Sequence, residues 1–139
     1  MTAYSLDLPR LAAKTLAVWF VLLFVEFAHG TLRVLFLVPR VGDFNSRQIG
    51  VFTGSLLLFV IIYLFAPWFG HLPKRALLAI GFVWLVLTVL FEFAAGLFLF
   101  HFPLQRILED FNIAKGGLFP LALLFLFFSP LLAARLRRL

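Results

Sequence analysis

Four long apolar stretches constrain this chain more than any other feature of its sequence. About 20 helical residues cross a bilayer core of about 30 Å. The stretches cover residues 15–37, 49–66, 76–100 and 117–134, and we expect Pro67 to end the second. Hydrophobic residues make up 64% of the chain, whereas soluble domains average roughly 45–50%. The sequence therefore predicts an all-α integral membrane protein with four transmembrane helices in a single domain, residues 1–139.

The second half of the chain repeats the first. The segment EFAHG at residues 26–30 recurs as EFAAG at 92–96, and DFN at 43–45 recurs at 110–112. Chance explains matching leucines in so apolar a chain, but not acidic, glycine and asparagine positions in the same order. We expect repeat one to cover about residues 14–67 and repeat two about 76–134. This predicts two tandem helical hairpins related by a pseudo-two-fold axis along the membrane normal.

Basic residues predict how the helices are oriented. One side of the predicted bundle has seven Lys and Arg with one acid, and the other has five with three acids. The richer side holds both termini and should be cytoplasmic. We expect residence in a bacterial inner membrane, with an N-terminal segment that is not a cleaved signal. The cations of the richer side are Arg10, Lys14, Lys74, Arg75, Arg135, Arg137 and Arg138.

Two acidic residues lie inside the predicted spans. Glu26 is eleven residues beyond Thr15, or about 16 Å along a helix, and Glu92 has a similar depth. A charged side chain at the bilayer centre costs about 2.5 to 3.5 kcal/mol on insertion scales, so it usually faces a partner, a cavity or a proton path. Two interpretations remain open: a proton- or ion-binding pair, and a pair held only by hydrogen bonds between helices.

Glu26 has polar neighbours on its own helix. His29 and Arg33 follow it at spacings that place all three on one face, and helical side chains lean toward the N-terminus. We therefore expect a polar column in which Arg33 leans back toward His29 and Glu26. In repeat two the corresponding positions are apolar, so Glu92 is predicted to face this column across the axis. The candidate proton or ion site is Glu26, His29, Arg33 and Glu92.

The links before the second and fourth helices carry a second set of candidates. Asp and Asn cap helix N-termini well, which predicts structural caps and ion pairs within each repeat. Alternatively, cations near these N-termini hold an anionic headgroup or solute. The predicted caps are Asp43, Asn45, Asp110 and Asn112, and the predicted ion pairs are Arg40 with Asp43 and Arg106 with Asp110. The predicted anion-binding set is Arg40, Arg47, Arg106 and Lys115.

Other sites are not indicated. The chain has no cysteine, and its histidines, at positions 29, 71 and 101, lie at depths too different for one haem. No metal-ligand spacing or nucleophile motif is present, so we predict no metal, no cofactor and no catalytic residue. A partner chain supplying a cofactor ligand stays open. Gly50 and Gly54 form a GxxxG segment typical of close helix packing.

Three functions fit these features. The first is a small transporter or channel, as a homo-oligomer, in which Glu26 and Glu92 bind protons or cations. The second is a non-catalytic structural, assembly or accessory subunit of a larger membrane complex, recruited through phenylalanine-rich faces. The third, less favoured, is an intramembrane lipid-processing enzyme with His29 as base and the outer arginines holding a phosphate. The basic residues behind the net charge of +6 lie at the ends of the predicted spans. Lipid is therefore the expected partner, and nucleic acid is not.

Overall fold

The protein is helical throughout the part that the structure describes. The computed structural model describes residues 7–139, and residues 1–6, which belong to the segment predicted not to be a cleaved signal, lie outside it. The elements are α1 (Leu8–Leu32), η1 (Arg33–Leu37), α2 (Val38–Val41), α3 (Asp43–Phe69), α4 (Lys74–Ala94), η2 (Ala95–Leu99), α5 (Leu104–Glu109), η3 (Ile113–Lys115) and α6 (Phe119–Leu136). Here η1 and η2 are π-helical and η3 is a 3₁₀-helix.

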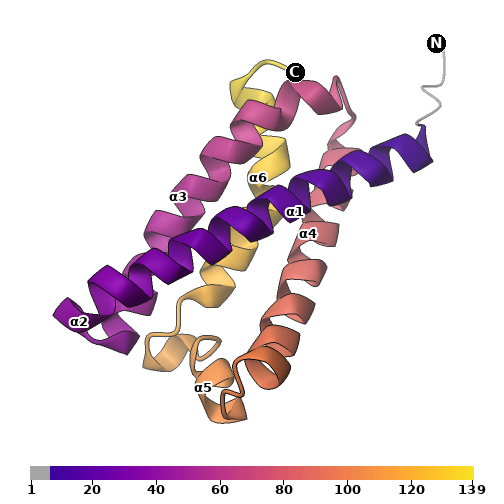
Figure 1. Cartoon of the computed structure of the whole chain (residues 1–139). Helices are drawn as coiled ribbons and strands as arrows, with labels where there is room; N and C mark the ends of the chain where they lie inside the picture. The colour runs from indigo at the N-terminus through magenta and orange to yellow at the C-terminus, as the bar shows by residue number, and fades with distance from the viewer. Residues whose placement is uncertain (1–6) are drawn as a thin grey trace.

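Four helical segments are long and apolar enough to cross a membrane, which confirms the predicted number of spans. They are Leu8–Val41, Asp43–Phe69, Lys74–Leu99 and Phe119–Leu136. The first has 34 residues, or about 51 Å at about 1.5 Å per residue, which exceeds a bilayer core of about 30 Å. A span of that length is accommodated by tilting. Figure 1 shows α1 crossing the other long helices obliquely.

The long helices alternate in direction. α6 packs against both α3 and α4, while α1 packs against α3 and contacts α4 less. In Figure 1 the start of α1 and the C-terminus lie at one end of the molecule, and α2 and α5 lie at the other. We call these the terminal end and the α2–α5 end. The helix order therefore forms two antiparallel pairs, α1 with α3 and α4 with α6.

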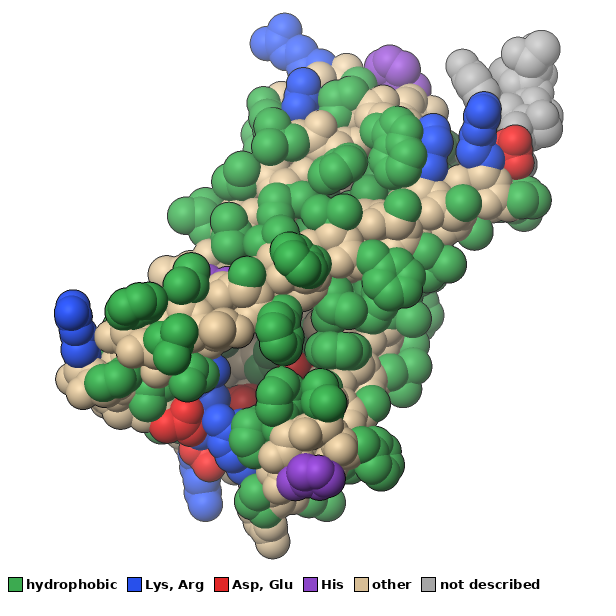
Figure 2. Space-filling model, viewed as in Figure 1, with side chains coloured by type: hydrophobic (Ala, Val, Ile, Leu, Met, Phe, Trp, Pro, Cys, Tyr) green, Lys and Arg blue, Asp and Glu red, His purple; other side chains and the backbone are tan. Residues whose placement is uncertain are grey.

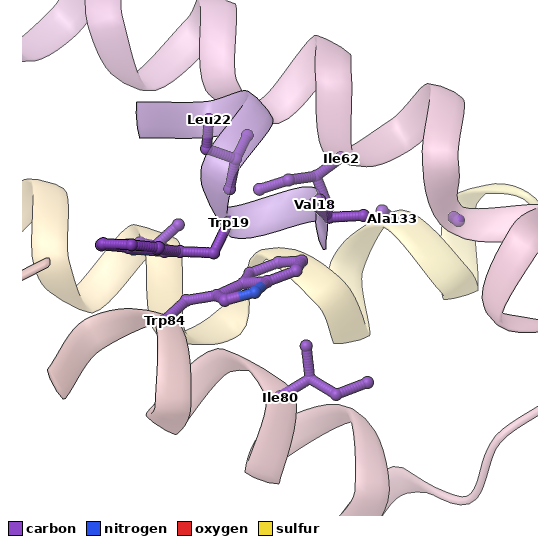
Figure 3. Packing of buried hydrophobic residues seen from close by; sticks show 9 residues of the cluster. Val18, Trp19, Leu22, Ile62, Ile80, Trp84 and Ala133 are labelled. Atoms are coloured by element: carbon purple, nitrogen blue, oxygen red, sulfur yellow. The ribbon is translucent and has the colours of Figure 1, made fainter. Parts of the chain in front are cut away.

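The core lies where α1 crosses the other three long helices. Trp84 of α4 and Val18 of α1 are completely buried there, packed with Ile62 of α3 and Ala133 of α6 (Figure 3). The Trp84 indole Nε1 donates to the Thr15 carbonyl at 2.9 Å. Such bonds matter in a bilayer because no water is present to replace them.

A second indole makes the reverse connection. Trp19 of α1 donates from Nε1 to the Thr88 hydroxyl of α4 at 3.2 Å. Each of these two helices thus donates one tryptophan N–H to the other, and a threonine oxygen on the other helix accepts it. The two bonds hold α1 and α4 at their crossing, although the two helices share little contact elsewhere.

Pro67 does not end α3, so that prediction is wrong. The helix continues to Phe69 and ends at Gly70, where φ is +76°. A proline inside a helix leaves the carbonyl four residues earlier without its donor. That carbonyl belongs to Tyr63, and it accepts instead from Arg137 Nη1 at 2.9 Å. The last residues of the chain therefore compensate the break, and the helix runs on.

The predicted caps are also wrong. Gly42, with φ +87°, is the N-cap of α3, and Leu118 is the N-cap of α6; no side chain caps either helix. Asp43 is the first residue of α3 and is held by arginines instead. The Asn45 amide donates to the Val41 carbonyl at 3.0 Å, at the end of α2. The remaining two residues, Asp110 and Asn112, use their main-chain oxygens to accept from Phe119 at 3.1 Å and from Gly117 at 2.8 Å.

α4 and α6 approach each other closely at Gly81 of α4. A Cβ added there would overlap the Phe127 carbonyl of α6. Substitution by alanine therefore forces the backbones apart, and overpacking typically costs about 1–3 kcal/mol. We expect Gly81→Ala to lower the free energy of unfolding by at least that much, measured by denaturant titration of the purified protein in mixed micelles.

Gly30→Ala is the matched control for this prediction. Gly30 is also a helical glycine, but no atom lies within 4 Å of an added Cβ. Alanine there should leave stability unchanged or raise it, because alanine has the higher helix propensity. Equal stabilities of the two variants would contradict the close α4–α6 packing.

Candidate functional site

The predicted polar column begins with a hydrogen bond between Glu26 and His29. Glu26 Oε1 lies 3.2 Å from His29 Nδ1, and His29 Nε2 lies 2.8 Å from the Thr53 hydroxyl of α3. The imidazole is mostly buried, with 17% of its side chain exposed. Both ring nitrogens are therefore engaged, and the imidazole links a carboxylate on α1 to a hydroxyl on α3.

The glycines of the GxxxG segment make room for this column. A Cβ at Gly54 would lie 3.1 Å from both carboxylate oxygens of Glu26, and one at Gly50 would lie 2.9 Å from Cδ of Arg33. The close packing expected of this motif thus serves polar side chains of α1. The sequence indicated the polar column and the GxxxG segment separately, and it did not predict that the two pack against each other.

Arg33 points away from the column, contrary to the prediction. Its Nη1 donates to the Ser46 hydroxyl at 2.7 Å and lies 3.9 Å from an Asp43 oxygen. Long basic side chains extend toward the polar edge of a membrane when acceptors are there. Arg33 therefore joins the charged residues at the α2–α5 end and leaves Glu26 to His29.

Glu26 and Glu92 line the same cavity, of about 590 Å³, together with residues of all four long helices. Glu26 Oε2 is buried without a hydrogen-bond partner. Among residues 7–139, the Glu92 carboxyl makes no hydrogen bond or ion pair. The π-helical segments also border this cavity, through Arg33 of η1 and Gly96 of η2. The cavity thus contains two acids whose hydrogen-bonding capacity is largely unused. That the two share one proton or cation stays a prediction.

Arg47 of α3 is the centre of a charged network at the α2–α5 end. Its Nη1 donates to Asp110 Oδ1 at 2.6 Å and its Nη2 to Glu109 Oε1 at 3.1 Å. Nε lies 3.3 Å from Asp43 Oδ2 but has no hydrogen-bond partner, so this contact is an ion pair only. With 11% of its side chain exposed, Arg47 is the most buried member of the network. Figure 2 shows acidic and basic side chains gathered at this end of the molecule.

Three ion pairs connect the two halves of the chain, while Asp43 also pairs with Arg33 and Arg47 of its own half. Arg106 Nη2 lies 3.3 Å from Asp43 Oδ2, whereas the sequence suggested Arg106 with Asp110 and Arg40 with Asp43. Burial raises the pKa of the Asp110 carboxyl, and this effect exceeds the opposing attraction of Arg47 and Arg106. The predicted partners were wrong because spacing along the chain ignores the antiparallel return of α3 and α6.

The predicted anion-binding set is only half assembled. Arg47 and Arg106 meet at Asp43, but Arg40 and Lys115 are exposed and make no ion pair within the described residues. The Arg106 guanidinium also stacks 3.8 Å from the Phe102 ring. Because carboxylates already surround the two buried guanidiniums, the structure leaves little free positive charge for an anion here.

His71 and His101 lie apart from the column. His71 is in the link between α3 and α4, and His101, with φ +54°, is in the link between η2 and α5. In residues 7–139 no group of three His, Asp or Glu side chains could hold a metal ion. Thr53, His29 and Glu26 do have the contacts of a hydroxyl, a base and an acid. Thr53 nevertheless lies inside α3, where the backbone amides of neighbouring residues are used by the helix and are not free to donate to an oxyanion.

Sequence reasoning missed several polar partners of these residues. Arg33 donates to the Ser46 hydroxyl, and His29 lies within hydrogen-bond distance of the Thr53 hydroxyl. Gln48 donates to the Gly116 carbonyl at 2.8 Å. Their closeness in sequence to the GxxxG segment could have identified these partners, because Ser46, Gln48 and Thr53 all lie within a few residues of Gly50 on α3.

Comparisons with protein-family models, with curated proteins and with solved structures find no match to this chain. Its function therefore has to be argued from the geometry of the site.

Loss of the central guanidinium should destabilise the fold. We expect Arg47→Met to lower the free energy of unfolding by about 1–3 kcal/mol, below the 3–5 kcal/mol typical of a fully buried pair. The reduction follows because two of its partners, Asp43 and Glu109, are 44% and 43% exposed and keep part of their hydration. Denaturant titration in micelles measures the effect.

Arg40→Met is the matched control. Arg40 is exposed and without an ion pair among the described residues, so its loss should change stability by less than about 0.5 kcal/mol. If both substitutions had the same effect, the network would not be holding the α2–α5 end together.

Proposed function

We propose that the chain is a duplicated two-span unit whose hairpins are related by a pseudo-two-fold axis. Three features support this, beyond the repeated sequence. The first helix of each hairpin passes into a π-helical segment. Trp19 and Trp84 make reciprocal bonds between α1 and α4. Arg47 with Asp110, and Arg106 with Asp43, make reciprocal ion pairs between the hairpins. These contacts make the two hairpins one rigid frame around the cavity.

Within that frame, the proposed function is proton or cation binding by Glu26 and Glu92, coupled to transport. The observation that carries it is the shared cavity, where Glu26 Oε2 and the Glu92 carboxyl have no partner among the described residues. An acid kept at membrane depth without a partner is costly and usually functional. A proton or a cation would supply the missing partner.

His29 gives Glu26 a possible route for protons. The chain of contacts runs from the Thr53 hydroxyl through the imidazole to Glu26. Thr53 is on the exposed surface of α3, whereas Glu26 borders the cavity. An imidazole is suited to such a relay because one ring nitrogen can accept a proton while the other donates one. Within residues 7–139 Glu92 has no comparable relay, so the two acids have different surroundings. A second copy of the chain would complete a path across the bilayer.

The second candidate is a non-catalytic subunit of a larger membrane complex. It is favoured by a phenylalanine stripe on α1, where Phe20, Phe24 and Phe27 are 59%, 75% and 56% exposed. Their spacing places them on one helix face. Either lipid or a partner helix covers such a stripe. Co-purification at fixed stoichiometry with other membrane chains, unaffected by changes at the two acids, would support this candidate.

Transport by the two acids is tested in liposomes. We expect the purified protein to carry protons, Na⁺ or K⁺ down an imposed gradient. Glu26→Gln and Glu92→Gln should each slow the flux at least about tenfold, because the bound ion loses its counter-charge. Glu109→Gln is the control, since Glu109 is an acid outside the cavity. Flux equal to that of protein-free liposomes, or unchanged in the double variant, would rule the proposal out.

The proposed orientation places the terminal end in the cytoplasm. Because the chain lacks cysteine, single substitutions report sidedness without background. In bacterial cells a membrane-impermeant maleimide should label His101→Cys directly and His71→Cys only after permeabilisation. Both histidines are exposed, in links at opposite ends of the long helices. The reverse labelling pattern would invert the orientation, and labelling of both in intact cells would contradict the topology.

A further inference from the structure

The cavity has mainly apolar walls. Leu22 of α1, Phe91 of α4 and Leu126 of α6 line it, and Trp19 packs edge-on against Phe91 with ring centroids 6.3 Å apart. Its volume of about 590 Å³ lies within the roughly 300–1,000 Å³ of small-molecule sites. A hydrated inorganic ion gains nothing from such walls. They suit a molecule with an apolar body.

The cavity is open toward the bilayer. Phe27 and Leu35 of the first span and Phe100 beyond η2 line it, and they are 56%, 60% and 48% exposed. Figure 2 shows a hollow below the oblique α1, bordered by hydrophobic side chains, with acidic side chains inside it. Side chains exposed on apolar spans contact lipid, so the opening between α1 and α4 faces the membrane interior. An occupant that dissolves in lipid can enter there.

The charge left unused inside the cavity is negative. Three arginines line it, but Arg47 and Arg106 are bound by carboxylates and Arg33 by Ser46 and Asp43. Glu26 Oε2, by contrast, is buried and unpartnered. Glu92 borders the same space without a hydrogen bond among the described residues. Electrostatic complementarity therefore requires a positive group on the occupant.

From these three observations we infer that the cavity binds a lipophilic organic cation, an ammonium or similar onium group on an apolar body, which enters from the bilayer. The cation lies between Glu26 and Glu92, and the body lies against the aromatic wall of Trp19 and Phe91. Aromatic faces add to the attraction for such cations. The inference rests on the proposed role of Glu26 and Glu92 and names the substrate class that they serve.

Two sources supply this chemistry, the headgroup of an amine-bearing phospholipid and a free lipophilic amine. Both place an onium group beside an apolar body, and both reach the cavity through lipid. The experiment therefore measures the shared chemistry first and the source second.

The test is binding of tetraphenylphosphonium to the full chain in dodecyl maltoside, measured by equilibrium dialysis. Tetraphenylborate, which has the same shape and the opposite charge, is the matched probe. We expect saturable binding of the cation and none of the anion. Glu26→Gln and Glu92→Gln should each weaken binding at least about tenfold. Glu92→Asp, which keeps the charge, should retain measurable binding, and Glu109→Gln should bind as the unsubstituted chain does.

Addition of phosphatidylethanolamine, with phosphatidylglycerol as control, identifies the source. Competition by the amine lipid alone assigns the site to a headgroup, and the absence of competition assigns it to a free amine.

Failure of this inference is distinguishable from failure of the proposed function. The inference is overturned if the chain does not bind the cation, binds both probes equally, or binds as tightly when both acids are amides. If ion flux in liposomes still depends on Glu26 and Glu92, the transport proposal stands without it. If cation binding depends on both acids but the chain shows no ion flux, the binding site is supported and the transport proposal is overturned.

Discussion

The structure depends on how the first span packs its polar side chains against α3. Glu26, His29 and Arg33 occupy one face of a helix that is otherwise apolar. Gly50 and Gly54 on α3 remove the side chains that would collide with that face. Thr53 and Ser46, between and before these glycines, then supply hydrogen bonds. In a bilayer an unsatisfied polar group costs several kcal/mol, so this match fixes the register of α1 on α3.

The two ends of the molecule pair their basic side chains with different kinds of partner. At the α2–α5 end, partly buried guanidiniums are neutralised by carboxylates, and Arg47 binds Asp43 of its own half as well as Glu109 and Asp110 of the other half. At the terminal end, cations bind main-chain carbonyls and aromatic rings. Lys14 donates to the Trp68 carbonyl at 2.8 Å, and Arg137 lies 4.7 Å from the Tyr63 ring. Between these ends, the cavity is lined by two acids that lie well inside the described spans, Glu26 and Glu92.

The sequence predicted those features that depend on the length of one segment or on the spacing of residues within it. Apolar runs predicted four spans, and helical periodicity placed Glu26 beside His29. What failed depends on contacts across the fold. Pro67 continues a helix because Arg137 replaces the missing donor at Tyr63. Asp43 pairs with Arg106 because the antiparallel return of the chain brings α5 beside α3. No spacing rule within one segment reports such partners, and the same holds for the direction in which Arg33 points.

The central position of α6 has a consequence for biosynthesis. α6 packs against both α3 and α4, and α1 has little contact with α4. α6 follows the other three spans in the chain, so those spans leave the ribosome before their main packing partner does. Until then Gly81 and the inner faces of α3 and α4 must be covered by lipid or by the insertion machinery. Packing of the first three spans is therefore completed only once α6 has been made, enters between α3 and α4, and brings Arg137 to the Tyr63 carbonyl.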